Sequence, residues 1–383
     1  MSDRKLRAWQ DAGLIDAATA WRIRDWEQAN ARPLLLWAVI GIGALAIGLG
    51  LVSVVAANWD AIPGQLRLAI HFAVMVGLSG WLWWRDPGLS RDHPWMHEAG
   101  VFVLGALGLT FMGHLGQVYQ TSSPLWQPVG LWLLLFAPLL LGRGLSWLTA
   151  AMLFGGFLFA AWNHALEWNG PWPEGTETAR MVREAALVSA PVLFGGASVW
   201  MAGRSLREAF WRRLGQMALA YAVVGASIMA IVAIERMPDE RDAKSIFAAA
   251  LVACGFGLAS AAGLFRLRQG PSGLSRAGIM AGCAAMPVIA YGLSGDETVA
   301  ALLFMALWAG IGAAALHAGW RGVFQAAVGV IAVRLIVLSF ELAGDLLTSG
   351  AGLIVSGLLI LGIAWGAVRV SKRFAPQAGE NAP

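Results

Sequence analysis

Apolar residues in this chain fall in long runs, and the short connectors between the runs hold most of the charged residues. Crossing roughly 30 Å of hydrocarbon takes about 20 residues of helix at about 1.5 Å per residue. Inside a bilayer, only a helix or a closed barrel satisfies every backbone polar group, and runs of this length favour helices. The pattern predicts an all-α fold, a polytopic transmembrane helical bundle of about 12 spans.

The predicted spans form two sets of six. They are placed near residues 34–57, 66–84, 99–119, 127–142, 145–162 and 185–202, and then near 214–234, 246–265, 277–293, 298–317, 322–341 and 351–370. Only Leu141-Gly142-Arg143-Gly144 separates the fourth span from the fifth, so a re-entrant pair is the alternative there. The bundle covers residues 34–371. Two six-span halves, 34–203 and 213–371, stay open as an alternative, because many transporters are duplicated although these halves share no matching residues.

The segment before the first span, residues 1–33, is polar and carries both signs of charge. Gly13 predicts the end of a first short helix, and Asp16 is placed to cap a second helix over 17–30. The segment therefore predicts a short cytoplasmic amphipathic helical hairpin. Its narrow apolar stripe leaves two interpretations, that the hairpin lies on the inner leaflet or that it packs on the protein's own loops.

Composition narrows the class of protein further. Hydrophobic residues make up 58% of the chain and charged residues 13%, whereas a soluble domain carries about 25% charged residues. Twenty Trp beside three Tyr indicate many span ends at bilayer interfaces, where Trp gathers. Cys254 and Cys283 both fall in apolar runs, which predicts small buried hydrophobic residues and no disulfide framework.

Basic residues predict the orientation. With the N-terminus inside, 20 of the 27 Lys and Arg residues fall in inside segments, six fall in outside segments, and Arg334 alone falls within a span. Because inside loops carry the excess of basic residues, this split favours cytoplasmic N- and C-termini, with a disordered cytoplasmic tail at 372–383. The basic residues are scattered between apolar runs, so the expected partner is the lipid bilayer and not nucleic acid.

Sequence motifs of common enzymes are missing. The chain has no G-x-x-x-x-G-K-[ST] phosphate loop, no H-E-x-x-H zinc pair, no G-x-S-x-G elbow and no C-x-x-C. His97-Glu98 is followed by Ala99-Gly100, with no second His one turn further on. We therefore expect no catalytic residue, no metal site and no cofactor, and an ATP-driven pump or a common hydrolase is disfavoured.

Arg334 is the strongest candidate for chemistry within a span. It lies about 18 Å into the span that starts near Gly322, at about 1.5 Å per residue. A central Arg costs about 2.5–3.5 kcal/mol, so we expect it to face the bundle interior with a polar partner from another helix. Glu341, seven residues further on, lies on the same helix face and is a second candidate. An anion or proton pathway and a structural Arg satisfied by carbonyl groups are both open.

A polar cluster closes the third span. His114 and Gln117 share a helix face, and Tyr119 follows them, so the three could line a cavity near the outer surface. A titrating His would suit such a cavity. The alternative is an ordinary interfacial His whose polar atoms are satisfied.

A polar cap between the first two spans is a candidate structural motif. It consists of Asn58, Trp59 and Asp60. Trp59 can anchor at the interface while its two neighbours satisfy helix ends, so a structural turn accounts for the motif.

Three short motifs occur in order: Gly13-Leu14-Ile15, Ala57-Asn58-Trp59-Asp60 with Ile62-Pro63, and Gly116-Gln117-Val118-Tyr119. Together they resemble a bacterial family of predicted membrane proteins of unknown function, number twenty-one fifty-seven in the domain-of-unknown-function series. The resemblance is best over the first 150 residues. It implies a membrane location, and no activity comes with it.

These patterns predict a multi-pass protein of the bacterial inner membrane and leave its activity open. A secondary transporter or permease is favoured, and it predicts a water-accessible cavity that reaches Arg334 or His114, with interrupted helices around it. A non-transporting scaffold or envelope-associated protein predicts that these groups are packed and dry. An enzyme acting on lipid is the third class, and it requires several acidic or His residues that converge at one interface.

Overall fold

The computed structural model describes residues 9–29, 62–86, 88–167, 177–205, 207–232, 240–267, 270–293 and 297–342, together with positions 6 and 46 and short stretches between 357 and 373. The chain divides into two units, Met1–Arg67 and Leu68–Pro383. Throughout these described ranges the regular structure is helical, with no β-strand.

The second unit is a stack of long apolar helices. Their bounds are α4 (Gly64–Arg85, which begins in the first unit), α5 (Gly88–Asp92), α6 (Pro94–Tyr119), α7 (Trp126–Arg143), α8 (Trp147–Glu167), α9 (Glu177–Ser189), the 3₁₀ turn η2 (Ala190–Leu193), α10 (Phe194–Ala202), α11 (Glu208–Val232), α12 (Glu240–Arg266), α13 (Gly270–Gly292), α14 (Glu297–His317) and α15 (Arg321–Leu342). Ten helical segments in the described part of the chain are long and apolar enough to cross a membrane. The polytopic all-α bundle predicted from the sequence is therefore confirmed.

Each of the ten segments coincides with one predicted span. The fourth and fifth are the separate helices α7 and α8, and each is long enough to cross the bilayer by itself. The sixth is longer than predicted, because α9, η2 and α10 together form one candidate span over Glu177–Ala202. The predicted first span, 34–57, lies outside the described residues except for position 46, and the predicted twelfth, 351–370, is described only in short stretches from residue 357 onward. The total of 12 spans and the division into two halves stay predictions.

The first unit contains α2 (Ala17–Ala29). Asp16 caps this helix, because its Oδ1 accepts a hydrogen bond of 2.7 Å from the Thr19 amide. Hydrogen bonds from Thr19 lower the pKa of the Asp16 carboxyl below its ordinary value. Gly13 has a φ of +69°, and the amides of Gly13 and Leu14 donate to the carbonyls of Gln10 and Trp9. This bonding ends the preceding turn as expected for a helix-terminating Gly, while the packing of the predicted hairpin stays a prediction.

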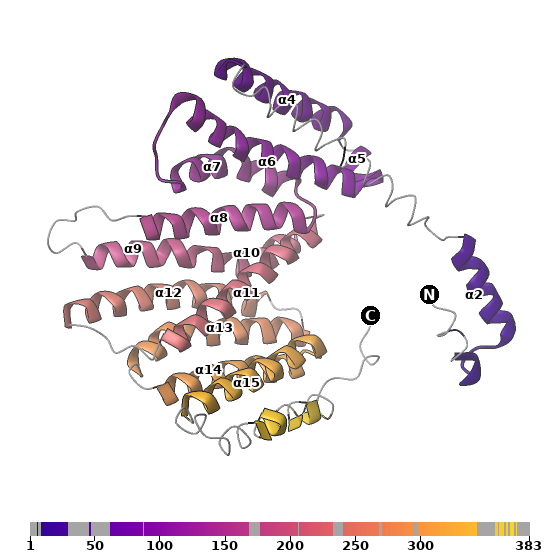
Figure 1. Cartoon of the computed structure of the whole chain (residues 1–383), viewed down its shortest axis with the longest axis vertical. Helices are drawn as coiled ribbons and strands as arrows, with labels where there is room; N and C mark the ends of the chain where they lie inside the picture. Colours follow the sequence, from indigo (N-terminus) through magenta and orange to yellow (C-terminus); the bar gives the residue numbers. More distant parts are fainter. Residues whose placement is uncertain are drawn as a thin grey trace. The chain divides into compact units, whose positions relative to one another are not determined.

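Neighbouring helices of the second unit pack against each other along the stack that Figure 1 shows. Helices α6, α7 and α8 pack together, α9 packs on α8 and α12, and α11 contacts α8, α10, α13 and α14. Helix α13 also packs on α12 and α14, and α15 packs on α14. Helix α11 thus lies between the first helices of the stack and the last.

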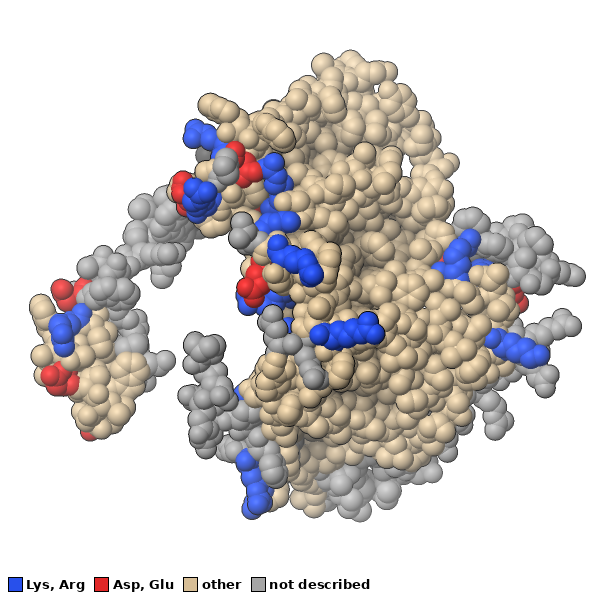
Figure 2. Space-filling model, turned by 180° about the vertical axis from the view of Figure 1, so that it is seen from behind, with Lys and Arg blue, Asp and Glu red and all other residues tan. Residues whose placement is uncertain are grey.

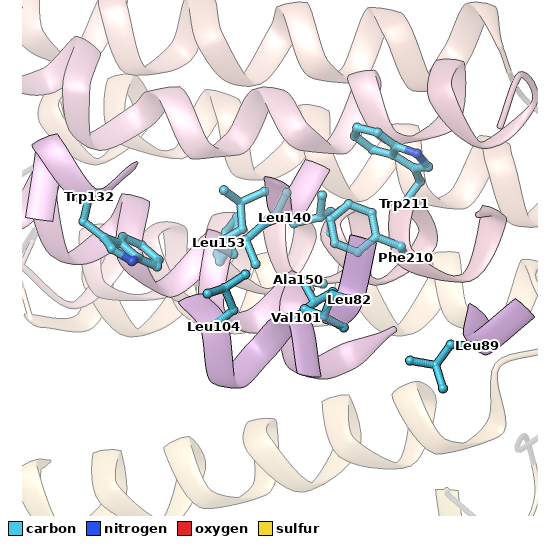
Figure 3. Close-up of a cluster of buried hydrophobic side chains, with 13 residues drawn as sticks. Leu82, Leu89, Val101, Leu104, Trp132, Leu140, Ala150, Leu153, Phe210 and Trp211 are labelled. Carbon is cyan, nitrogen blue, oxygen red and sulfur yellow. The ribbon is translucent and has the colours of Figure 1, made fainter. Parts of the chain in front are cut away.

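A buried cluster joins α6, α7, α8 and α11. Trp132, Leu140 and Phe210 are at most 1% exposed, and Figure 3 shows them with side chains from neighbouring helices. Trp132 Nε1 donates to the Gly105 carbonyl at 2.8 Å, so the indole is satisfied although it is buried. The cluster fixes the position of α11 relative to α6, α7 and α8.

Basic side chains gather at one end of the second unit, as Figure 2 shows. We call this the arginine-rich end, and helix termini and connectors place there Arg85, Arg91, Arg143, Arg204, Arg207, Arg212, Arg213, Arg266, Arg276 and Arg321. Several of these guanidinium groups lie over Trp rings, at 4.4 Å for Arg204 over Trp200 and 4.6 Å for Arg213 over Trp147. Paired Arg and Trp side chains are typical of the level at which lipid headgroups meet the hydrocarbon.

Candidate functional site

The span formed by α9, η2 and α10 is interrupted. Pro191 stands in the 3₁₀ turn, where it has no amide hydrogen to continue the helical bonding. Carbonyl groups that lose their helical partners at such a break need other donors, because lipid offers none. The break should therefore be stabilised by neighbouring helices.

Side chains from two helices supply those partners. Ser260 of α12 is 1% exposed; its hydroxyl donates to the Val192 carbonyl at 2.8 Å and accepts from the Gly196 amide at 3.0 Å. Tyr221 of α11 donates to the Val188 carbonyl at 2.8 Å. The interruption is thus a built feature, with hydrogen bonds that hold it from both α11 and α12.

Small residues let α10 approach its neighbours closely just after the break. A Cβ added to Gly196 would lie 3.0 Å from the backbone oxygen of Ser260, and one added to Gly215 of α11 would lie 2.3 Å from the Ser198 hydroxyl. Close approach of this kind is how membrane helices pack without large side chains. It also leaves little side-chain volume between α10 and α11 near the arginine-rich end.

A cavity of about 220 Å³ lies at that point, and we call it the α10–α13 cavity. Its lining comes from four helices and the turn after α10: Gly195, Ser198, Val199, Ala202, Gly203, Glu208, Arg212, Gly215, Gln216, Leu219, Leu264 and Arg276. Glu208 and Arg212 belong to the first turns of α11, and Leu219 lies about 16 Å beyond Glu208 along that helix. The cavity therefore extends from the arginine-rich end into the span region.

Two guanidinium groups dominate the charge of the cavity. Arg212 is 47% exposed, and its Nη1 lies 3.8 Å from a carboxylate oxygen of Glu208, which is 69% exposed. Arg276 is half-buried, and its guanidinium lies 5.7 Å from the ring centre of Trp320. The ionisable lining is thus two cations from different helices and one exposed carboxylate, which is the charge balance of an anion site.

A second polar cluster at the arginine-rich end has a structural role. Glu98 of α6 is 3% exposed, and its two carboxylate oxygens accept hydrogen bonds from the amides of Leu145, Ser146 and Thr149 and from the hydroxyls of Ser146 and Thr149. These donors form the start of α8. A carboxylate there satisfies amides that have no helical acceptor and complements the helix dipole.

Ion pairs and a backbone contact surround this cap. Asp86 pairs with Arg143 and lies 3.6 Å from Nε2 of His97, which is 2% exposed. Arg207 donates to the Gly144 carbonyl at 3.3 Å. Burial lowers the pKa of Arg207, and the nearby charge of Arg143 lowers it further. Asp86, Arg143 and Arg207 thus each have a partner within the protein, and the cluster locks α6, α7 and α8 to the connector before α11.

The residues predicted at the end of the third span occupy different environments. His114 is 8% exposed, and its Nδ1 lies 3.4 Å from Nδ1 of His71 on α4. His71 also contacts the Leu107 carbonyl through Nε2 at 3.1 Å. Gln117 is exposed, and Tyr119 is 61% exposed. The structure therefore brings His114 to His71 and leaves Gln117 and Tyr119 on the surface.

The other predicted candidates do not line the α10–α13 cavity. Arg334 is half-buried within α15. The side chain of Glu341 and the residues Asn58, Trp59 and Asp60 lie outside the described part of the structure. Over the described residues, no group of three His, Cys, Asp or Glu side chains is placed to hold a metal ion.

None of the residues that line this cavity was predicted from the sequence as a binding residue. Arg212 counted as one of the inside basic residues, and Arg276 counted as another. Two signals pointed to the site: Pro191 lies inside a predicted span, and Gly195-Gly196 stand about one helical turn after it. A Pro followed by small residues within a span is the pattern of an interrupted helix beside a binding site.

Comparison with known proteins finds one similarity, in the first part of the chain. Residues 7–149 match the family model described as "Predicted membrane protein (DUF2157)". No curated protein matches the chain, and no solved structure matches it. The matched region contains Glu98 and the α8 residues that it caps, whereas the α10–α13 cavity lies beyond it. Residues 7–149 of this multi-pass membrane protein are thus similar to the DUF2157 family of predicted membrane proteins.

Proposed function

We propose that this protein is a secondary transporter or permease for a small solute, embedded in a bacterial inner membrane with both termini in the cytoplasm. The observation that carries the proposal is the interrupted span α9–η2–α10 beside the α10–α13 cavity. Secondary transporters bind substrate where discontinuous helices leave backbone and side-chain polar groups facing a cavity.

The distribution of charge supports an inward-facing state. The cavity has Glu208, Arg212 and Arg276 in its wall at the arginine-rich end, and loops rich in Arg and Lys face the cytoplasm in membrane proteins. With this orientation, solute reaches the cavity from the cytoplasm. Transport then requires a second state in which the cavity opens at the opposite end, where Arg180, Arg183 and Lys244 lie.

A scaffold protein would keep the cavity in one fixed state. A lipid-modifying enzyme would need an acid, a base or a nucleophile in it, and the ionisable lining consists of Arg212, Arg276 and Glu208. The arginines bind anions but do not exchange protons near neutral pH, and Glu208 is the exposed member of an ion pair. The lining therefore suits binding better than catalysis.

Access to the cavity from each side of the membrane tests the proposal. We would introduce Leu219→Cys into a background in which Cys254 and Cys283 are replaced by Ala, and treat oriented vesicles with a membrane-impermeant thiol reagent. Leu219 lines the deep part of the cavity. A transporter predicts labelling from the arginine-rich side and slower labelling from the opposite side.

Two control positions on the same helix bracket the result. Ala218→Cys should resist labelling from both sides, because Ala218 is 0% exposed in the core. Glu208→Cys should react from the arginine-rich side alone, because Glu208 lies at the exposed rim. If Leu219→Cys reacts from one side only, with or without a proton gradient, alternating access is refuted and the scaffold alternative is favoured.

A further inference from the structure

We propose that the α10–α13 cavity binds a phosphate group, held between the guanidinium groups of Arg212 and Arg276. The inference names a ligand class for the cavity used in the transport proposal, and to that extent it rests on the proposed function. The argument starts from the arginines themselves.

Arg276 is a half-buried cation, and none of the described residues gives it an anionic partner. Within the described residues it makes no hydrogen bond or ion pair, and its one assigned contact is the Trp320 ring at 5.7 Å. A cation at the level of a helical span loses hydration, and this cost is offset when an anion or a carbonyl oxygen pairs with it. Because Arg276 lines the cavity, the cavity is the place for that anion.

Three other arginines at the same end have protein acceptors, whereas Arg85, Arg91, Arg266 and Arg321 are exposed to the surface. Arg143 pairs with Asp86, Arg204 donates to the Trp200 carbonyl, and Arg213 donates to Gln216. Arg276 differs from all three in its lack of an acceptor and in its place on a cavity wall. This difference favours a binding role for Arg276, in addition to the role that basic residues have in setting the orientation of the protein in the membrane.

Arg212 supplies the second cation. Its one ion pair, to Glu208, spans 3.8 Å between two exposed side chains, and exposed pairs of this kind contribute little free energy. A ligand anion can therefore take the place of Glu208 at small cost. Two arginines from α11 and α13 then face one anion, which also removes the repulsion between them.

The size and the number of cations favour phosphate over a carboxylate or a large organic anion. A cavity of about 220 Å³ is smaller than the roughly 300–1,000 Å³ that drug-sized ligands fill. A carboxylate offers two oxygens in one plane, whereas phosphate directs oxygens along several axes. Arginines on different helices can each make a paired contact with phosphate, and Arg is the side chain best suited to that contact.

The phosphate can belong to a free anion or to a lipid headgroup, since the cavity opens at the level of the Arg and Trp side chains that mark the headgroup region. Basic pockets between membrane helices are known binding places for anionic headgroups. Both sources present the same group to Arg212 and Arg276, so the experiment separates them.

Binding would be measured as thermal stabilisation of the purified full-length protein in a neutral detergent, titrated with inorganic phosphate. In parallel, the protein would be placed in nanodiscs of phosphatidylcholine that contain increasing fractions of phosphatidylglycerol. We expect stabilisation that saturates in one of the two series. Arg276→Gln should weaken the apparent affinity in that series by about tenfold or more, the loss expected for hydrogen bonds to a charged group.

Three further variants separate a binding site from a general charge effect. Arg276→Lys keeps the charge without the planar fork and should weaken binding less than the Gln variant. Glu208→Gln removes the competing carboxylate and should strengthen binding. Arg266→Gln removes an exposed cation at the same end, outside the cavity, and should change nothing.

Saturation with inorganic phosphate assigns a free anion, and saturation with phosphatidylglycerol alone assigns a lipid headgroup. Absence of saturation in both series refutes the inference, and so does equal weakening by Arg266→Gln and Arg276→Gln. The transport proposal is tested independently, because the labelling of Leu219→Cys from both sides does not require phosphate. A protein that binds phosphate but is labelled from one side keeps this inference and loses the transport proposal.

Discussion

Replacing Glu98 with Ala tests whether one buried carboxylate holds the start of α8. In the structure this carboxylate accepts five hydrogen bonds, three from amides and two from hydroxyls of Ser146 and Thr149. Thr149 is 0% exposed and Glu98 is 3% exposed, so water cannot easily replace the lost acceptor. The variant therefore leaves several donors unsatisfied in a buried place.

The magnitude follows from those donors. Each buried group left unsatisfied costs about 1–3 kcal/mol, but the two hydroxyls can turn to other acceptors and the first turn of α8 can relax. We expect a net loss of about 3–5 kcal/mol, in the range for removing one partner of a buried charged network. Glu98→Gln keeps the oxygen that accepts four of the bonds and turns an NH₂ group toward the Leu145 amide, so about half of that loss is expected.

Thermal unfolding of the purified protein in detergent provides the measurement. We expect the midpoint to fall by about 5–10 °C for Glu98→Ala and by less for Glu98→Gln. Asp92→Asn is the matched control, because Asp92 is an exposed carboxylate at the end of α5. If the midpoint of Glu98→Ala stays within 1 or 2 °C of the control, on the order of 0.5 kcal/mol, the cap does not stabilise α8 and the reasoning is refuted.

Two further predictions concern the helix cap in the first unit and close packing in the second. The pKa of Asp16 is lowered by Thr19, so its stabilisation of α2 is complete above about pH 4 and is lost as pH falls through the lowered pKa. Rate-corrected hydrogen exchange should show α2 opening at low pH in the wild type and no such transition in Asp16→Asn. Gly108→Ala places a Cβ 2.2 Å from Cζ of Phe136 and should cost about 1–3 kcal/mol. A second change, Phe136→Leu, should restore part of the thermal midpoint, and no recovery would contradict the clash.

Much of the fold follows from the length of the apolar runs. A run of about 20 apolar residues has few alternatives to a spanning helix, which is why all ten described spans coincide with predicted ones. Local helix signals were equally direct. Gly13 adopts a positive φ, and Asp16 accepts the bond expected of an N-cap.

The candidate site was less predictable, because it depends on which helices face each other. Arg334 could be chosen from the sequence because it lies deep in a predicted span. Arg212 and Arg276 lie near span ends, where basic residues are common, so the sequence does not single them out. Their shared cavity arises only when α11 and α13 pack together. His71 and His114 illustrate the same limit, since 43 residues separate two rings whose nitrogens lie 3.4 Å apart.

Helix α11 connects the family-matched region to the cavity. Phe210 is 0% exposed in the core shared with α6, α7 and α8, and Arg212, two residues later, lines the cavity. One turn of this helix thus serves stability on one face and binding on the other. Because the Glu98 cap anchors α8 against this core, loosening the cap should lower the thermal midpoint without changing phosphate affinity measured well below that midpoint. A fall in affinity for Glu98→Ala at low temperature would instead show that the cap sets the position of Arg212, and the two regions would then work as one site.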